Sequence, residues 1–169
     1  QQVSWQTLTN QLLRIAEAMG ARVKSLIASP DFHRFELARS GDKEILDFVV
    51  ERVPQLDSQK QSFGPIRVDT LREIIANKLC TLVGRTELKD LIDLYFLERA
   101  GHDVMTHLAD AQLKEGGLDP SVLSYLLSQV QVTAIPEYVL EPVTPEDLDA
   151  FVRRLQRQFA ELAFPNPST

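Results

Sequence analysis

The stretch VDTLREIIANKLCTLVGRTELKDLIDLYFL, residues 68–97, has the pattern of two consecutive helices with a break at Gly84-Arg85. Thr70 followed by Glu73 matches a capping box, which predicts the start of the first helix. Thr86 is placed to cap the second helix. Apolar residues recur at helical spacing in both halves, so each helix has one face suited to burial. These faces consist of Leu71, Ile74, Ile75, Leu79, Leu82 and Val83, and then of Leu88, Leu91, Ile92, Tyr95 and Phe96.

Charged residues interrupt these apolar helices. Because burying an unpaired charge is costly, they must be paired, solvated in a cleft, or functional. Asp90 and Asp93 are three residues apart and therefore share a helix face. We expect Asp93, which has apolar neighbours, to be partly buried. The structural alternative is that Lys78 or Arg85 pairs with Asp93 and holds the two helices together. Glu73, in turn, has a simple alternative role as a cap of its own helix.

Two spaced motifs carry a family resemblance: Glu73-x-x-Ala76-x-Lys78, and Arg85-x-x-x-Lys89-Asp90-x-x-Asp93. They resemble the third and fourth motifs of the AbiEii-type nucleotidyltransferase-like toxins of bacterial abortive-infection and type IV toxin–antitoxin systems. The resemblance extends from about Phe35 to the C-terminus. It implies a nucleoside triphosphate and Mg²⁺ as ligands, an RNA such as tRNA or a protein as acceptor, an antitoxin partner, and a location in the bacterial cytoplasm.

The resemblance also implies roles for individual residues. Lys78, Arg85 and Lys89 would bind the nucleotide, and Lys78 would reach the triphosphate as a point charge. Asp47 corresponds to the third metal-binding carboxylate of the family, although Ile45 stands where the family has a basic residue. The alternative for Asp47 is an exposed residue on an edge strand. The full set of implied catalytic residues is Asp47, Lys78, Asp90 and Asp93, with Asp47 also a metal ligand.

The first metal-binding motif of the family, a Gly-Ser turn followed by Asp-x-Asp, is not found in these residues. The single Asp-x-Asp, Asp147-Leu148-Asp149, lies in the first turn of a predicted helix, where residues two apart point about 200° apart and do not chelate one ion together. The resemblance places the missing motif just before Gln1. We therefore expect no nucleotide transfer by the family mechanism from these 169 residues as they stand. Two alternatives are a non-catalytic binding or interaction module that keeps the fold, and an unrelated helical regulatory domain with an accidental match.

The remaining patterns predict an α+β fold: a small mixed β-sheet of nucleotidyltransferase-like character in the first third, packed on a helical C-terminal half. Residues 1–67 would form the α/β lobe and residues 68–169 the helical lobe. We predict a first helix over 4–19 and strands over 21–29, 32–39, 43–52 and 66–68, with a polar loop over 54–64. Later helices are predicted over 103–114, 119–130 and 144–163. On the last helix we expect solvated arginines, namely Arg153, Arg154 and Arg157.

Composition excludes several classes of function. The chain has no apolar run long enough for a transmembrane helix, and its first residues do not resemble a signal peptide. A net charge of −6 argues against non-specific nucleic-acid binding but leaves room for a local basic cleft. The histidines lack metal-ligand spacing, and the single cysteine, Cys80, is predicted to lie in the core in a reducing compartment.

Overall fold

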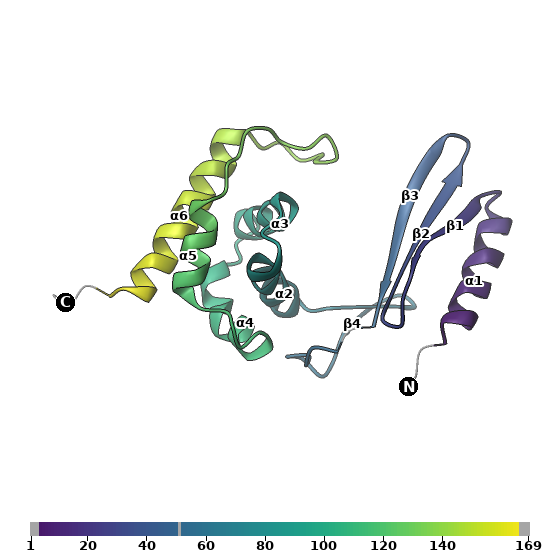
Figure 1. Ribbon diagram of the computed structural model, residues 1–169, viewed down its shortest axis with the longest axis horizontal. Coiled ribbons are helices and arrows are strands. Elements are labelled where there is room, and N and C mark those ends of the chain that lie inside the picture. Colours follow the sequence, from purple (N-terminus) through teal and green to yellow (C-terminus); the bar gives the residue numbers. More distant parts are fainter. Residues whose placement is uncertain (1–3, 51, 166–169) are drawn as a thin grey trace. The chain divides into compact units, whose positions relative to one another are not determined.

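Contacts within the computed structural model, which describes residues 4–50 and 52–165, divide the chain into two units. The first spans residues 1–53 and the second residues 54–169. Figure 1 shows the α/β character of the first unit and the helical character of the second. The segment 54–67, which we placed in the α/β lobe, belongs by its contacts to the helical unit.

The first unit consists of one helix and a three-stranded sheet. Helix α1 (Trp5–Ala18) begins at Ser4, whose hydroxyl accepts a hydrogen bond from the Thr7 amide. The strands β1 (Arg22–Ala28), β2 (Phe32–Arg39) and β3 (Asp42–Val49) follow in order and pair antiparallel. Ser40 and Gly41, both with positive φ, form the two-residue turn that joins β2 to β3.

One face of this sheet carries the core of the first unit. His33 and Phe35 lie opposite Phe48 and Leu46, so their side chains point to the same face. The Trp5 ring of α1 stacks on His33 with 4.1 Å between ring centroids, and its indole N–H donates to the Pro30 carbonyl. The opposite face carries residues that alternate with these, Arg34 and Asp47 among them.

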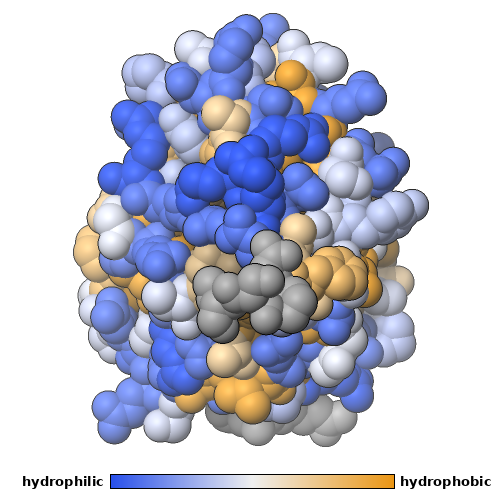
Figure 2. Space-filling view, turned by 90° about the vertical axis from the view of Figure 1, so that its left-hand side faces the viewer, coloured by the Kyte–Doolittle hydropathy of each residue, from blue (hydrophilic) through white to orange (hydrophobic). Residues whose placement is uncertain are grey.

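The second unit packs its helices around one hydrophobic core. A short hairpin of β4 (Gln61–Phe63) and β5 (Ile66–Val68) precedes them. The helical elements are α2 (Leu71–Gly84), α3 (Leu88–Arg99), the 3₁₀ turn η1 (Val104–His107), α4 (Leu108–Lys114), α5 (Pro120–Ser128) and α6 (Pro145–Ala163). Figure 2 looks onto the side that bears α5 and α6, where the surface is mostly hydrophilic with smaller apolar patches.

Side-chain caps begin most of these helices, as the sequence predicts. Thr70, Asp119 and Thr144 accept hydrogen bonds from amides of the first turns of α2, α5 and α6. The predicted cap at Thr86 is wrong. The N-cap position of α3 is occupied one residue later, by Glu87, while Thr86 has a positive φ and donates its hydroxyl proton to the Leu82 carbonyl.

The α+β class is confirmed, and the predicted strands at residues 32–39 and 66–68 form with the expected bounds. All strand pairs are antiparallel rather than mixed, because consecutive strands are joined by short turns. Strand β4 lies inside the segment predicted as a loop. In the described parts of the chain, no helix is long and apolar enough to cross a membrane.

Candidate functional site

The carboxylate of Asp90 lies at the junction of α2 and α3, and its side chain is 0% exposed. Lys78 Nζ lies 3.0 Å from Asp90 Oδ1, and Arg85 Nε lies 3.1 Å from Oδ2. Lys78 comes from α2, Asp90 from the first turn of α3, and Arg85 from the turn between them. A buried charge is thus paired on both sides, as its burial requires.

Lys78 bridges two aspartates, since its ammonium group also pairs with Asp93. The Lys78 side chain is 26% exposed, whereas that of Asp93 is 49% exposed. Asp93 is therefore half buried, because α3 buries its neighbours Ile92 and Leu94 and turns Asp93 toward solvent. The pairing of Lys78 with Asp93 matches the structural alternative considered above.

The environment keeps both central groups charged at neutral pH. Burial alone would raise the pKa of Asp90, but the hydrogen bonds from Lys78 and Arg85 outweigh it and hold this pKa below its usual range. For Lys78, burial acts to lower the pKa, and the hydrogen bonds to Asp93 and Asp90 outweigh it and raise the pKa. Lys78 therefore carries a fixed positive charge that remains partly accessible to solvent.

A pocket of about 460 Å³ opens beside Lys78. Lys78 and Asp93 supply its charged wall, and His102 is its other polar residue. The remaining lining is apolar and comes from α2, α3 and the residue after α3: Leu71, Ile74, Phe96, Leu97 and Ala100. An apolar cavity with a few polar groups has the typical character of a small-molecule site.

The two other implied nucleotide-binding residues lie outside this pocket. Lys89 Nζ is 2.9 Å from Glu87, and both side chains are about half exposed. Arg85 points to Asp90 and lies 3.9 Å from Glu87. Asp90 contacts both Lys78 and Arg85, whereas Lys89 contacts Glu87. Of these four candidates, Lys78 alone lines the pocket.

Asp47 lies in the first unit, on the edge strand β3, apart in the sequence from the other five candidates. Its two carboxylate oxygens accept hydrogen bonds from Arg34 Nε and Nη2, each at 2.7 Å. This bidentate pair raises the pKa of Arg34 through the hydrogen bond and the charge of Asp47.

Metal-ligating groups do not gather anywhere in the described residues: within 4–50 and 52–165, no three side chains of His, Cys, Asp or Glu lie close enough to hold an ion. Asp147 and Asp149 contact different residues, Thr144 and Arg153, as expected for positions two apart on a helix. The side chains described here therefore do not by themselves fit a bound Mg²⁺, and the metal role of Asp47 stays a prediction.

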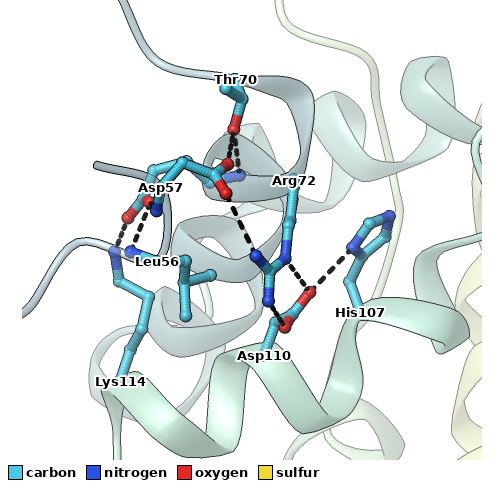
Figure 3. A network of polar contacts seen from close by, with 8 residues as sticks. Leu56, Asp57, Thr70, Arg72, His107, Asp110 and Lys114 are labelled. Atoms are coloured by element: carbon cyan, nitrogen blue, oxygen red, sulfur yellow. Dashed lines mark hydrogen bonds and ion pairs between the residues drawn. The ribbon is translucent and has the colours of Figure 1, made fainter. Parts of the chain in front are cut away.

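A second polar network, absent from the sequence-based expectations, surrounds Glu73 and includes the labelled residues Leu56, Asp57 and Lys114 (Figure 3). Glu73 forms an ion pair with Lys114 of α4, and each side chain is only 3% exposed. Its carboxylate also accepts hydrogen bonds from the amides of Leu56 and Asp57. The alternative that Glu73 does no more than cap its helix is wrong, because its carboxylate binds both the segment before β4 and Lys114 of α4.

The guanidinium group of Arg72 extends this network across the surface of the helical unit (Figure 3). It donates to Asp57 and to Asp110, and Asp110 also contacts His107. The hydrogen bond from Arg72 holds the pKa of Asp110 below its usual range. Residues 38 positions apart meet here, so local sequence patterns carry no signal of the contact.

Two of the three arginines expected to be solvated are tied to other elements. Arg153 donates to the carbonyls of Leu127 and Val130, at the end of α5. Arg154 pairs with Glu98 of α3. The expectation is wrong for these two because α6 packs beside α5 and α3, whereas Arg157 is exposed as predicted.

Comparison with known proteins identifies the family. The sequence model of the family described as nucleotidyl transferase AbiEii toxin, type IV toxin–antitoxin system, matches residues 17–166. No curated protein and no solved structure matches the chain. The match includes residues 17–53 of the first unit, most of the second unit and all six candidate residues. The chain therefore belongs to the AbiEii family of nucleotidyl transferase toxins of type IV toxin–antitoxin systems.

Proposed function

We propose that the helical unit binds a nucleoside triphosphate, with Lys78 holding a phosphate and the adjoining pocket holding the base and ribose. The observation that carries this proposal is the position of Lys78 in the wall of an otherwise mostly apolar pocket of about 460 Å³. A lysine ammonium group binds phosphate as a point charge, and an apolar wall with an aromatic residue, here Phe96, suits the face of a base.

The two aspartates have different roles in this proposal. Asp90 is buried and also bound by Arg85, so it acts as a positioning residue that keeps Lys78 charged and in place. Asp93 is half exposed, and an exposed ion pair contributes only about 0–1 kcal/mol. A phosphate therefore displaces Asp93 from Lys78 at small cost, while the contact with Asp90 remains.

Membership in the family implies a nucleotide substrate and an antitoxin partner. We extend this to the transfer of a nucleotide from a nucleoside triphosphate to an RNA or protein acceptor in the bacterial cytoplasm. Asp47 as a catalytic metal ligand and Mg²⁺ as the ion remain predictions from the resemblance. The unrelated helical domain is wrong, since residues 22–49 form a sheet and the family match covers both units.

The non-catalytic binding module is the second candidate. The observation in its favour is that the described residues bring no three metal-ligating side chains together. The two candidates differ in nucleotide binding and in transfer, and metal-dependent nucleotide binding by the isolated chain would count against the non-catalytic module. Because the first metal-binding motif is not found in residues 1–169, the transfer test uses the product of the whole gene. It is incubated with each α-³²P-labelled nucleoside triphosphate, Mg²⁺ and total bacterial RNA or protein, and labelled acceptor forms only with the transferase.

Calorimetric titration with the four nucleoside triphosphates tests the site itself. Loss of one charge-assisted hydrogen bond costs about 1.5–3 kcal/mol, so Lys78→Met should weaken binding by roughly 10- to 150-fold. Lys60→Met is the matched control. Lys60 has a similar exposure of 27% and also pairs with an aspartate, Asp69, but does not line the pocket. The nucleotide affinity of the Lys60→Met variant should equal that of the unchanged protein.

Lys78→Met also removes one partner of the buried Asp90 carboxylate, so a second variant tests the pocket without disturbing that ion pair. Ala100→Trp adds an indole at an exposed pocket position and removes no ion pair. It should lower nucleotide affinity while the circular dichroism spectrum stays unchanged. Nucleotide binding that survives both Lys78→Met and Ala100→Trp at full affinity would refute the proposed site.

A further inference from the structure

A second groove, of about 440 Å³, lies between α3 and α6. It shares no residue with the pocket beside Lys78 and uses a different face of α3. Arginines and aromatic rings dominate its lining, which consists of Tyr95, Glu98, Arg99, Asp147, Ala150, Phe151, Arg154 and Arg157. We call this set the arginine groove.

Two arginines of the groove lie over its aromatic rings. Arg154 Cζ is 5.3 Å from the ring centroid of Phe151, and Arg99 Cζ is 5.7 Å from that of Tyr95. The two rings meet edge to face with 5.6 Å between centroids. Arg99 also donates to the Pro142 carbonyl at 3.0 Å. Cation–π stacking and this hydrogen bond orient the guanidinium groups before any ligand arrives.

The groove carries more positive charge than its own carboxylates neutralise. Glu98 pairs with Arg154, and Asp147 accepts a hydrogen bond from the Thr144 hydroxyl at 2.8 Å. Arg157 is exposed and makes no hydrogen bond or ion pair with any residue in the described ranges. Three arginines face two carboxylates, in a chain whose net charge is −6. The excess of positive charge in this groove therefore stands out against the rest of the chain.

We propose that the arginine groove binds a single strand of nucleic acid, with a phosphate at Arg157 and a base stacked on the Tyr95–Arg99 face. Guanidinium groups match the geometry of phosphate oxygens, and bases stack on aromatic and guanidinium planes without regard to sequence. An acidic peptide would satisfy the charge of Arg157 but would leave the stacked faces unused. That the strand is the acceptor of the transferred nucleotide rests on the proposed function.

Fluorescence anisotropy with a labelled single-stranded RNA of about 12 nucleotides, within the range bound by one small domain, tests the groove. Arg157→Glu should weaken binding at least 10-fold and lower the slope of log affinity against log salt by about 1. Arg14→Glu is the matched control: Arg14 is exposed on α1, has no partner among the described residues, and undergoes the same change of charge. It should leave the affinity nearly unchanged.

Three results would overturn the inference: no binding of RNA or of DNA of the same sequence, equal losses in both variants, or binding of a labelled oligoglutamate that displaces RNA and depends on Arg157. The last would assign the groove to an acidic protein segment. Nucleotide titration of Arg157→Glu separates this inference from the proposed function. Unchanged nucleotide affinity with weakened RNA binding supports the groove as a separate site. RNA binding without nucleotide binding refutes only the proposed function.

Discussion

The replacement Lys114→Met should be among the most destabilising single changes in the helical unit. It removes the cation from an ion pair in which both side chains are 3% exposed, and it leaves the Glu73 carboxylate buried. Breaking such a pair on one side costs about 3–5 kcal/mol. Glu73 keeps the amide hydrogen bonds from Leu56 and Asp57, at 2.8 and 3.4 Å, which stabilise its charge. We therefore expect a loss near the lower end, about 3 kcal/mol.

Urea unfolding followed by circular dichroism at the helical band measures this loss. With a slope of about 1–3 kcal/mol per molar urea, the midpoint should fall by roughly 1–3 M. Trp5, the only tryptophan, lies in the first unit and stacks on His33, so its fluorescence reports the unfolding of that unit separately. Lys89→Met removes an exposed pair with Glu87 and should cost less than about 1 kcal/mol.

The double variant Glu73→Gln/Lys114→Met tests the cause. The glutamine side chain would retain an oxygen that accepts from the Leu56 amide but would carry no charge, so the double variant should be more stable than Lys114→Met alone. A loss under about 1 kcal/mol for Lys114→Met, or a double variant less stable than the single one, would refute the argument that an uncompensated carboxylate causes the effect.

Four further predictions concern other contacts. Arg153→Met removes the guanidinium group that donates to the carbonyls at the end of α5, and should lower the free energy of unfolding in urea by about 1–3 kcal/mol. Arg157→Met should leave the free energy of unfolding nearly unchanged. Thr144→Ala removes the cap of α6 and should cost about 1 kcal/mol, recovered in part by Thr144→Ser. Burial raises the pKa of the Cys80 thiol to about 11, so native Cys80 should react slowly with iodoacetamide at pH 8 and rapidly in urea; rapid native labelling would contradict its burial. The pKa of Asp110 is lowered in the folded state, so its contribution to stability is complete above the ordinary value of 3.8 and is lost as the pH falls through the folded pKa. In urea unfolding measured between pH 5 and pH 2, Asp110→Asn should therefore show a smaller loss of stability with falling pH than the unchanged protein.

Local patterns predicted the elements of the fold well, because caps, turns and periodicity act over a few residues. Thr70 and Thr144 begin helices as expected, and Ser40-Gly41 forms the hairpin turn. Thr86 failed as a cap because the break between α2 and α3 needs a residue with positive φ at that position. Strand β4 was missed because its three polar and aromatic residues give no alternation long enough to detect.

Sequence periodicity could not predict contacts between residues far apart in the chain. The adjoining motifs suggested that Lys78 pairs with Asp93, but its contact with the buried Asp90, at 3.0 Å, was not predicted. The contact of Glu73 with Lys114 spans 41 residues, and no local rule links the two positions. The exposure of Asp93 depends on which side of α3 meets the core, and two apolar neighbours do not determine that side.

The burial of Asp90 affects how a genetic screen for non-toxic variants should be interpreted. A substitution at Asp90 removes the buried anion that Lys78 and Arg85 share at the junction of α2 and α3, so we expect a less stable protein that is less abundant in the cell. Asp93, half exposed, tolerates replacement with the chain still abundant in the cell. Escape mutations at Asp90 therefore report on protein abundance, and escape mutations at Asp93 report on the binding or turnover of substrate. Immunoblots of each escape variant distinguish the two classes.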